Sequence, residues 1–221
     1  MCIRDRLKAA ANNSETLYER EPGYAERYRD RRFVSGTGRG THSREVRAIR
    51  RLLRTAGSTE PSGAWLDMPC GAGRLTAELP GELAVQADRD PGMVTACRGQ
   101  GFACSVARAA ALPFADGCFE GALSMRLLHH ISDQTERVAI LRELRRVTDG
   151  PLIVSFFHSI SFQHLRRTLR RKLRGRRNTG RTAIRWSQFR ADLDAAGWAA
   201  HTAVPLRRFV SEQWIVLAMP R

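Results

Sequence analysis

The sequence is short of acidic residues, cysteine and long apolar runs, and each shortage excludes a class of protein. Only 22 Asp and Glu residues oppose 37 Lys and Arg residues, which gives a formal net charge of +15. A charge of this size favours anionic partners, such as a phosphate-bearing substrate, a nucleic acid or an acidic membrane surface. The apolar stretches, such as Pro151–Phe157, are far shorter than the roughly 20 residues that span a bilayer, so we expect no transmembrane segment.

The five cysteines are odd in number and form no C-x-x-C pair. The sequence therefore predicts neither a disulfide framework nor a structural zinc site, and no other metal site. A reducing cytoplasm fits best, so we expect a cytoplasmic protein, with peripheral attachment to a membrane as the alternative. Residues 1–6 precede no apolar region of a signal peptide, and we interpret them as an assembly scar outside the fold.

The hydrophobic residues that are present, 43% of 221, are enough for the core of one domain of ordinary size. The charge is uneven along the chain. Residues 63–158 carry 9 basic and 11 acidic residues, whereas residues 159–221 carry 14 basic and 3 acidic ones. We therefore expect a near-neutral centre between basic flanks.

Apolar runs alternate with segments of helical periodicity through this centre. The runs predicted as strands are residues 64–68, 83–87, 102–106, 119–125, 152–157, 199–206 and 213–219. The predicted helices are residues 74–79, 91–98, 134–150 and 186–196. Alternation of this kind indicates a parallel sheet covered by helices on both faces, and the short turn before the last strand permits only antiparallel pairing there.

The sequence thus predicts an α/β fold: a Rossmann-like, doubly wound, mostly parallel seven-stranded sheet with an antiparallel final strand. Residues 1–60 would form a helical amino-terminal cap with a Gly-rich break at residues 35–40. Residues 61–221 would form the main domain, with a basic helical insertion at residues 159–185.

A Gly-rich turn follows the first predicted strand, and an acidic residue ends the second. In Asp67-Met68-Pro69-Cys70-Gly71-Ala72-Gly73, glycines let the backbone approach a ligand closely. Asp88, at the end of the second strand, is of the type that holds ribose hydroxyls in doubly wound nucleotide-binding folds. The alternative is that Asp88 and Asp90 only cap the helix that begins at Pro91.

Two common nucleotide sites do not fit this turn. The dinucleotide fingerprint needs a small residue where Thr76 stands, and the Gly-Lys-Ser/Thr of a P-loop is absent. An acidic residue at Asp67 would be unfavourable beside a pyrophosphate, but its carboxylate can accept a hydrogen bond from an ammonium group.

At this point the chain resembles the class I S-adenosylmethionine-dependent methyltransferases, particularly the small-molecule, methyltransferase type 11-like branch. The resemblance covers about residues 60–157. Its blocks are Leu66 to Gly73, Ala87 to Met93, Ala111 to Asp116, Phe119-Glu120, Leu127 to Ile131 and Leu141 to Val147.

The resemblance implies S-adenosyl-L-methionine as cofactor and a role for each matching residue. Asp67, Gly71 and Gly73 would line its methionine end, and Asp88 would bind the ribose hydroxyls. The other implied positions are Met93 on the adenine, Ala109 with Arg108 at the adenine edge, and Arg126 near the methionine moiety.

Two residues depart from the family pattern. Pro69 stands where glycine is frequent, and proline lacks an N–H. Arg108 stands where an acidic residue is frequent, and arginine cannot accept a hydrogen bond from an adenine amino group.

Two adjacent histidines follow the fourth predicted strand, at the edge where open α/β sheets bind ligands. His130, and after it His129, is the candidate general base for an acceptor that must lose a proton. The alternative is that one histidine packs in the core and the other caps the next helix.

The predicted insertion is strongly basic: Ser161–Arg185 contains ten Lys and Arg residues and no acidic residue. Phe162, Leu165, Leu169 and Leu173 recur at helical spacing, so one face would be apolar. The segment could cover an anionic small-molecule or lipid-like acceptor, lie on an anionic membrane, bind nucleic-acid phosphates, or be a solvated basic surface.

The sequence therefore favours a methyltransferase that acts on a small-molecule or lipid-like acceptor. The alternatives are a methyltransferase of RNA or another polyanion, and a non-catalytic adaptor that retains the fold.

Overall fold

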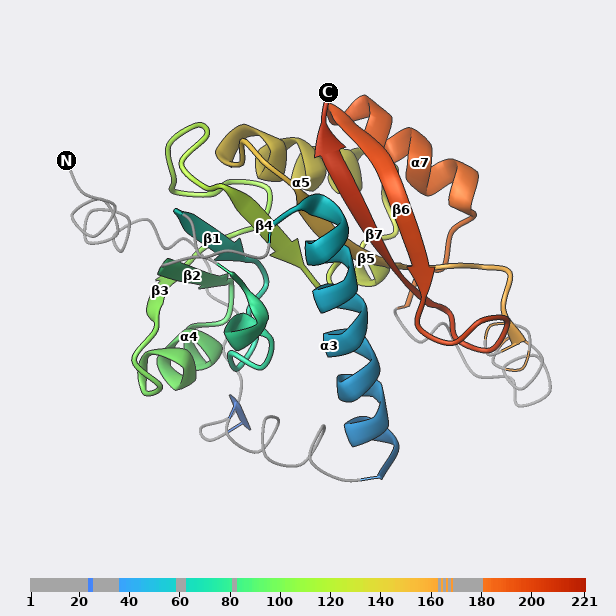
Figure 1. Ribbon diagram of the computed structural model, residues 1–221, viewed down its shortest axis with the longest axis horizontal. Helices are drawn as coiled ribbons and strands as arrows, with labels where there is room; N and C mark the ends of the chain where they lie inside the picture. Colours follow the sequence, from blue (N-terminus) through green and yellow to red (C-terminus); the bar gives the residue numbers. More distant parts are fainter. Residues whose placement is uncertain are drawn as a thin grey trace.

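The computed structural model describes residues 24–25, 36–58, 63–80, 83–162, 164, 166, 168 and 181–221. Within these residues seven strands form one sheet in the order β3-β2-β1-β4-β5-β7-β6 (Figure 1). The strands are β1 (Ala64–Asp67), β2 (Leu83–Asp88), β3 (Ala103–Val106), β4 (Gly121–Ser124), β5 (Leu152–Phe157), β6 (Trp198–Pro205) and β7 (Gln213–Pro220). The helices are α3 (Gly36–Ala56), α4 (Pro91–Arg98), α5 (Gln134–Val147) and α7 (Trp186–Ala195), with single 3-10 turns η2 (Thr76–Glu78) and η3 (Leu128–His130).

The strand directions confirm the predicted fold class. Strands β1 to β5 pair in parallel, whereas β7 pairs antiparallel with both β5 and β6. Because β7 runs against both neighbours, β6 runs in the same direction as β5. The carboxyl ends of β1, β2, β4, β5 and β6 therefore all lie at one edge of the sheet.

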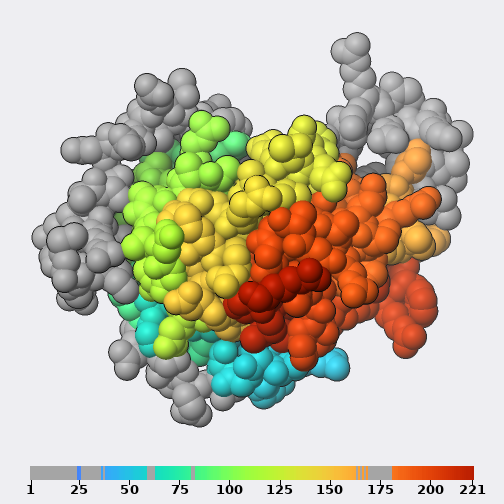
Figure 2. Space-filling view, turned by 90° about the horizontal axis from the view of Figure 1, so that it is seen from above, coloured from blue at the N-terminus to red at the C-terminus, as the bar shows by residue number. Residues whose placement is uncertain are grey.

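Alternating side chains along the strands divide the core into two layers. Leu66 of β1 packs with α5 and α7 on one face of the sheet. Trp65, the residue before it, packs with α3 on the other face. Figure 1 shows α5 and α7 together on one side of the sheet, and Figure 2, seen from above, shows them side by side on the surface. The sheet is thus covered on both faces, as its apolar strands require.

Two of these helices begin where the sequence predicts, because an aspartate caps the N-terminus of each. Asp133 accepts a hydrogen bond from the Glu136 N–H at 3.0 Å and caps α5. Asp90 accepts one from the Gly92 N–H at 2.9 Å and caps α4, whose first residue is Pro91.

The helix predicted for residues 74–79 is wrong. After Gly73, with φ of +76°, the chain forms only the 3-10 turn η2, and Leu79 is extended. Pro80 follows, and the residue before a proline avoids the helical conformation. The segment is too short to propagate an α-helix between these two limits.

The Gly-rich break predicted at residues 35–40 is also wrong, because residues 36–40 belong to α3. Glycines disfavour a helix intrinsically, but α3 buries Ile49 and Leu52 completely against the sheet. Burial of two such side chains outweighs the intrinsic cost of the glycines in its first turns. Most of the predicted amino-terminal cap before α3, and most of the predicted basic helix at residues 161–185, lie outside the described residues.

Candidate active site

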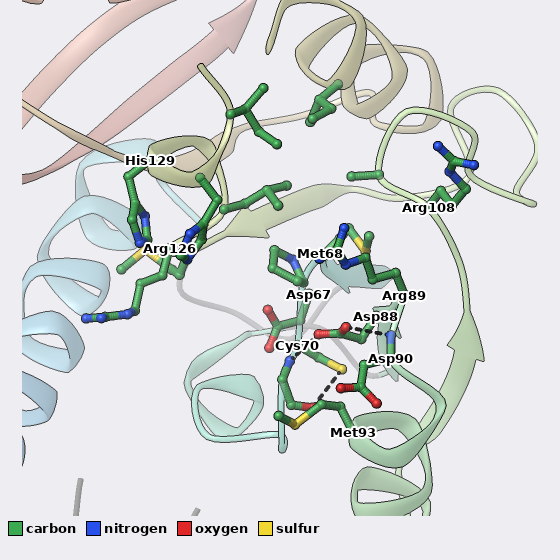
Figure 3. A pocket seen from close by; sticks show the side chains of 18 of the residues that line it. Asp67, Met68, Cys70, Asp88, Arg89, Asp90, Met93, Arg108, Arg126 and His129 are labelled. Carbon is green, nitrogen blue, oxygen red and sulfur yellow. Dashed lines mark hydrogen bonds between the residues drawn. The ribbon is translucent and has the colours of Figure 1, made fainter. Parts of the chain in front are cut away.

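A cavity of about 600 Å³ opens where β1, β2 and β4 end (Figure 3). Its size lies within the roughly 300–1,000 Å³ typical of small-molecule sites. The wall consists of the turn after β1, the end of β2, residues 108–110, and the segment from β4 to η3. This is the edge at which open α/β sheets bind ligands.

The turn after β1 is tied to the end of β2 by one carboxylate. Asp88 accepts a hydrogen bond from the Gly71 N–H at 2.9 Å and a second from the Asp90 N–H at 3.0 Å. Burial raises the pKa of Asp88, and these two N–H groups oppose the rise. The arrangement fixes Gly71 against β2 and keeps an acidic group at the cavity wall.

The residues present fit an adenosine cofactor that carries an ammonium group. Gly71 has φ of +54°, and no atom lies within 4 Å of the position where a Cβ would stand, so a ligand can approach its backbone. The carboxylate oxygens of Asp88 retain lone pairs for ribose hydroxyls. Met93 adds an apolar side chain to the same wall (Figure 3).

Asp67 is a buried acid at the end of β1. Its Oδ2 accepts a hydrogen bond from the Thr76 hydroxyl at 2.9 Å, and the residue is 2% exposed. Burial raises the pKa of Asp67 to about 7, although the Thr76 hydrogen bond and the charge of Arg74 lower it. The charge of Asp67 therefore changes close to neutral pH.

Arg126 leaves β4 in the left-handed conformation, with φ of +63°. This conformation is uncommon for a non-glycine residue, and here the Arg126 N–H donates to the Ser155 hydroxyl of β5 at 2.7 Å. The turn sends the guanidinium toward α3 (Figure 3).

Glu45 of α3 receives this guanidinium, and the sequence analysis does not identify it. Its carboxylate is fully buried, accepts a hydrogen bond from Arg74 at 2.7 Å, and lies 3.5 Å from Arg126. The Gln213 amide of β7 donates to the same group at 2.7 Å. Glu45 precedes Ile49 and Leu52 by four and seven residues, so an acid on the apolar stripe of a helix is the signal that could have revealed it.

The two histidines occupy different environments in η3. His129 is 2% exposed, and its ring stacks on Phe157 with 4.1 Å between centroids. His130 is exposed and also lines the cavity. His130 is thus the histidine that an acceptor can reach from solvent.

The cavity brings together nearly all of the predicted site residues. Those that line it are Asp67, Gly71, Asp88, Met93, Ala109, Arg126, His129 and His130. Gly73 is not among them, because it packs behind the wall, where an added Cβ would lie 3.2 Å from Cys97. Arg108 is exposed at the rim, and Pro69, after a cis peptide bond, lines the cavity.

The described residues offer neither a metal site nor a membrane-spanning helix. No group of three His, Cys, Asp or Glu side chains there is arranged to hold a metal ion. No helix in that part of the chain is long and apolar enough to cross a bilayer.

Part of the chain matches a known family, and its fold matches solved structures. Residues 66–154 match the family model of a methyltransferase domain. The magnesium protoporphyrin IX methyltransferase of Synechocystis PCC 6803, solved with bound S-adenosylhomocysteine, has a TM-score of 0.69 at 17% identity, over 99% of this chain and 94% of that one. A SAM-dependent methyltransferase from Thermotoga maritima has a TM-score of 0.58 at 16% identity, over 81% of this chain and 90% of that one. At these identities the two structures show a common fold.

A curated relative matches the same central region. The tRNA (carboxymethyluridine(34)-5-O)-methyltransferase alkbh8 of Xenopus tropicalis is 31% identical over 88 residues, 39% of this chain. The aligned part is 14% of that protein's length, so the likeness concerns one domain.

The sheet, the glycine turn and the acidic end of β2 together form a cavity of a kind that suits a nucleotide. The match over residues 66–154 identifies a methyltransferase domain in that part of the chain, and the fold is that of S-adenosylmethionine-dependent methyltransferases. Proteins of this class use S-adenosylmethionine as methyl donor, and Synechocystis PCC 6803 magnesium protoporphyrin IX methyltransferase has been solved with that cofactor and with its demethylated product.

We predict that the affinity for S-adenosylhomocysteine rises with pH near neutrality. Below the pKa of about 7, Asp67 is protonated and cannot accept a hydrogen bond from an ammonium group as a carboxylate does. Between about pH 6 and 8 the dissociation constant should fall roughly tenfold, which isothermal calorimetry measures. Asp67→Asn should remove this pH dependence, and an unchanged slope in that variant would contradict the assignment.

A second prediction concerns Glu45. Glu45→Gln should lower the free energy of unfolding by about 3 kcal/mol, measured with urea, because it leaves two largely buried arginines without their carboxylate. Glu78→Gln is the matched control, since its partner Arg50 is 62% exposed. The control should lose less than about 1 kcal/mol, and equal losses in both variants would refute the special position of Glu45.

Proposed function

We propose that the protein transfers a methyl group from S-adenosylmethionine to a small-molecule or lipid-like acceptor that carries an anionic group. The observation that carries this proposal is a cavity lined by both carboxylate and guanidinium groups. Asp67, Asp88 and Met93 come from β1, β2 and α4, where Arg74 and Arg89 also line the cavity. Arg126, which is paired with Glu45, and Arg181 line it near η3.

The two carboxylates and Met93 suit the cofactor. Asp88 would accept from the ribose hydroxyls, ionised Asp67 would accept from the ammonium group, and Met93 would pack against the adenine. S-adenosylmethionine, when bound, supplies a methyl group that is already activated by its sulfonium. The protein's own task is then to orient the acceptor and to exclude water.

The arginine near η3 suits the acceptor. Arginine side chains favour a carboxylate or a phosphate, and Arg181 belongs to the basic insertion predicted at residues 159–185. The backbone holds this segment at the cavity, because the Thr182 N–H donates to the carbonyl of His129 at 2.7 Å. His130 would accept the proton of an acceptor that must lose one.

Asp88 provides the direct test of cofactor binding. Asp88→Ala should weaken S-adenosylhomocysteine binding at least about tenfold by calorimetry, because two hydroxyl partners are lost. Asp116→Ala, which removes an 81% exposed carboxylate outside the cavity, is the matched control and should bind normally. Both variants are compared by thermal unfolding, and absence of binding to the unaltered protein would end the proposal.

A further prediction separates the two histidines. His130→Gln should lower kcat about 10²- to 10⁴-fold while the dissociation constant for S-adenosylhomocysteine stays unchanged. His129→Gln should instead lower thermal stability, because His129 is buried against Phe157. An unchanged kcat in His130→Gln would show that no proton passes to this residue.

RNA is the second candidate acceptor, favoured by the match to a tRNA methyltransferase and by the net charge of +15. Incubation with radiolabelled S-adenosylmethionine and fractionated lipid, metabolite and RNA extracts distinguishes the two. Label in RNA, with binding that weakens steeply as salt rises, would replace the first candidate. Cofactor binding with no labelled product in any fraction would favour the adaptor.

A further inference from the structure

Three large apolar side chains are exposed at one place on the surface. Ile160, Phe162 and Phe209 are 73%, 61% and 77% exposed, and they are the exposed large hydrophobic residues of the described part of the chain. The Phe162 N–H donates to the Phe209 carbonyl at 3.0 Å, so the segment after β5 meets the turn between β6 and β7. Figure 1 shows these two segments side by side. We call these three residues the apolar tip.

Hydrogen bonds hold the apolar tip in an ordered shape. The Ile160 N–H donates to His158 Nδ1 at 3.1 Å, and the Ser211 N–H donates to the Arg207 carbonyl at 3.0 Å. Phe209 has φ of +62°, a conformation that is a genuine outlier for a bulky residue. A strained backbone that turns an aromatic ring into solvent points to a function for that ring.

The two described segments that carry the apolar tip also carry exposed charged residues, and all of these are basic. Arg166, Arg207 and Arg208 are exposed, and Arg208 lies over the Phe209 ring with 5.0 Å to the centroid. Residues 159–191 contain no Asp or Glu, and Glu212, the nearest acid in sequence to Phe209, is 6% exposed. Apolar side chains ringed by positive charge complement an anionic lipid surface.

We propose that the apolar tip docks the protein on an anionic lipid bilayer. Aliphatic Ile160 fits the acyl boundary of a bilayer, whereas only the two phenylalanine rings of the apolar tip could stack on nucleic-acid bases. The two phenylalanines and the arginine stems would enter the interface, with the guanidinium groups at the lipid phosphates.

The topology places this docking surface at the same edge of the sheet as the candidate active site. The apolar tip follows the carboxyl ends of β5 and β6, and the cavity lies at the same edge, past β1, β2 and β4. Residues 182–184 connect the cavity to the end of β5, because the Thr182 N–H donates to the carbonyl of His129 and the Ile184 N–H to that of Phe157, at 2.7 and 2.9 Å. Docking at the apolar tip would bring the cavity edge toward the lipid surface.

Co-sedimentation of the full chain with lipid vesicles tests the proposal without any methyl transfer. The probes are vesicles of phosphatidylcholine alone and of phosphatidylcholine with an equal part of phosphatidylglycerol. The unaltered protein should bind the anionic vesicles and not the neutral ones. Phe162→Ser combined with Phe209→Asn should lose at least about tenfold in partition coefficient, because two apolar side chains no longer enter the interface.

A charge-matched pair of variants separates local docking from general attraction. Arg207→Gln with Arg208→Gln should lower the partition coefficient roughly 30-fold, while Arg47→Gln with Arg51→Gln, on the exposed side of α3, should change it little. Thermal unfolding verifies that all variants fold. Equal losses in both arginine pairs, or unchanged binding of the phenylalanine variant, would overturn the proposal. The proposal would also be overturned if the protein bound tRNA but not vesicles, and if the same phenylalanine substitutions abolished the binding of tRNA.

Discussion

The carboxylate of Asp88 organises one half of the candidate site. It accepts from the N–H groups of Gly71 and Asp90, so it joins the turn after β1 to the segment after β2. Asp90 in turn caps α4 through the Gly92 N–H, and α4 carries Met93 into the cavity wall. The contacts of Asp88 therefore position both the accessible backbone of Gly71 and the apolar side chain of Met93.

Glu45 organises the other half from outside the matched domain. It belongs to α3, before residues 66–154, and it contacts Arg74 and Arg126 of the cavity as well as Gln213 near the chain's end. A buried carboxylate between two guanidinium groups is stable only while its partners stay in place. The position of Arg74 and Arg126 thus depends on segments that flank the matched residues, whereas the contacts of Asp88 lie within them.

The elements that local chemistry determines could be predicted from the sequence. Strands with alternating layers, the Asp133 and Asp90 caps, and the antiparallel last strand all follow from short-range patterns. The contact between Glu45 and Gln213 could not be predicted, because it joins residues 168 positions apart. The left-handed turn at Arg126 was equally hidden, since its partner is the Ser155 hydroxyl on another strand. The helix expected at residues 74–79 failed because Pro80 competes with a favourable periodicity.

The direction of one strand decides what lies beside the cavity. Because the turn between β6 and β7 is short, β7 must run antiparallel, and β6 must end at the same edge as β5. Phe209 therefore projects from the edge where β1, β2 and β4 form the cavity, and not from the opposite edge of the sheet. If a long crossover connection had joined β6 to a parallel β7, the segment that carries Phe209 would not lie next to Phe162. The same topology that gathers the candidate cofactor residues thus also gathers the exposed apolar residues, and an acceptor held in a lipid surface would approach from that edge.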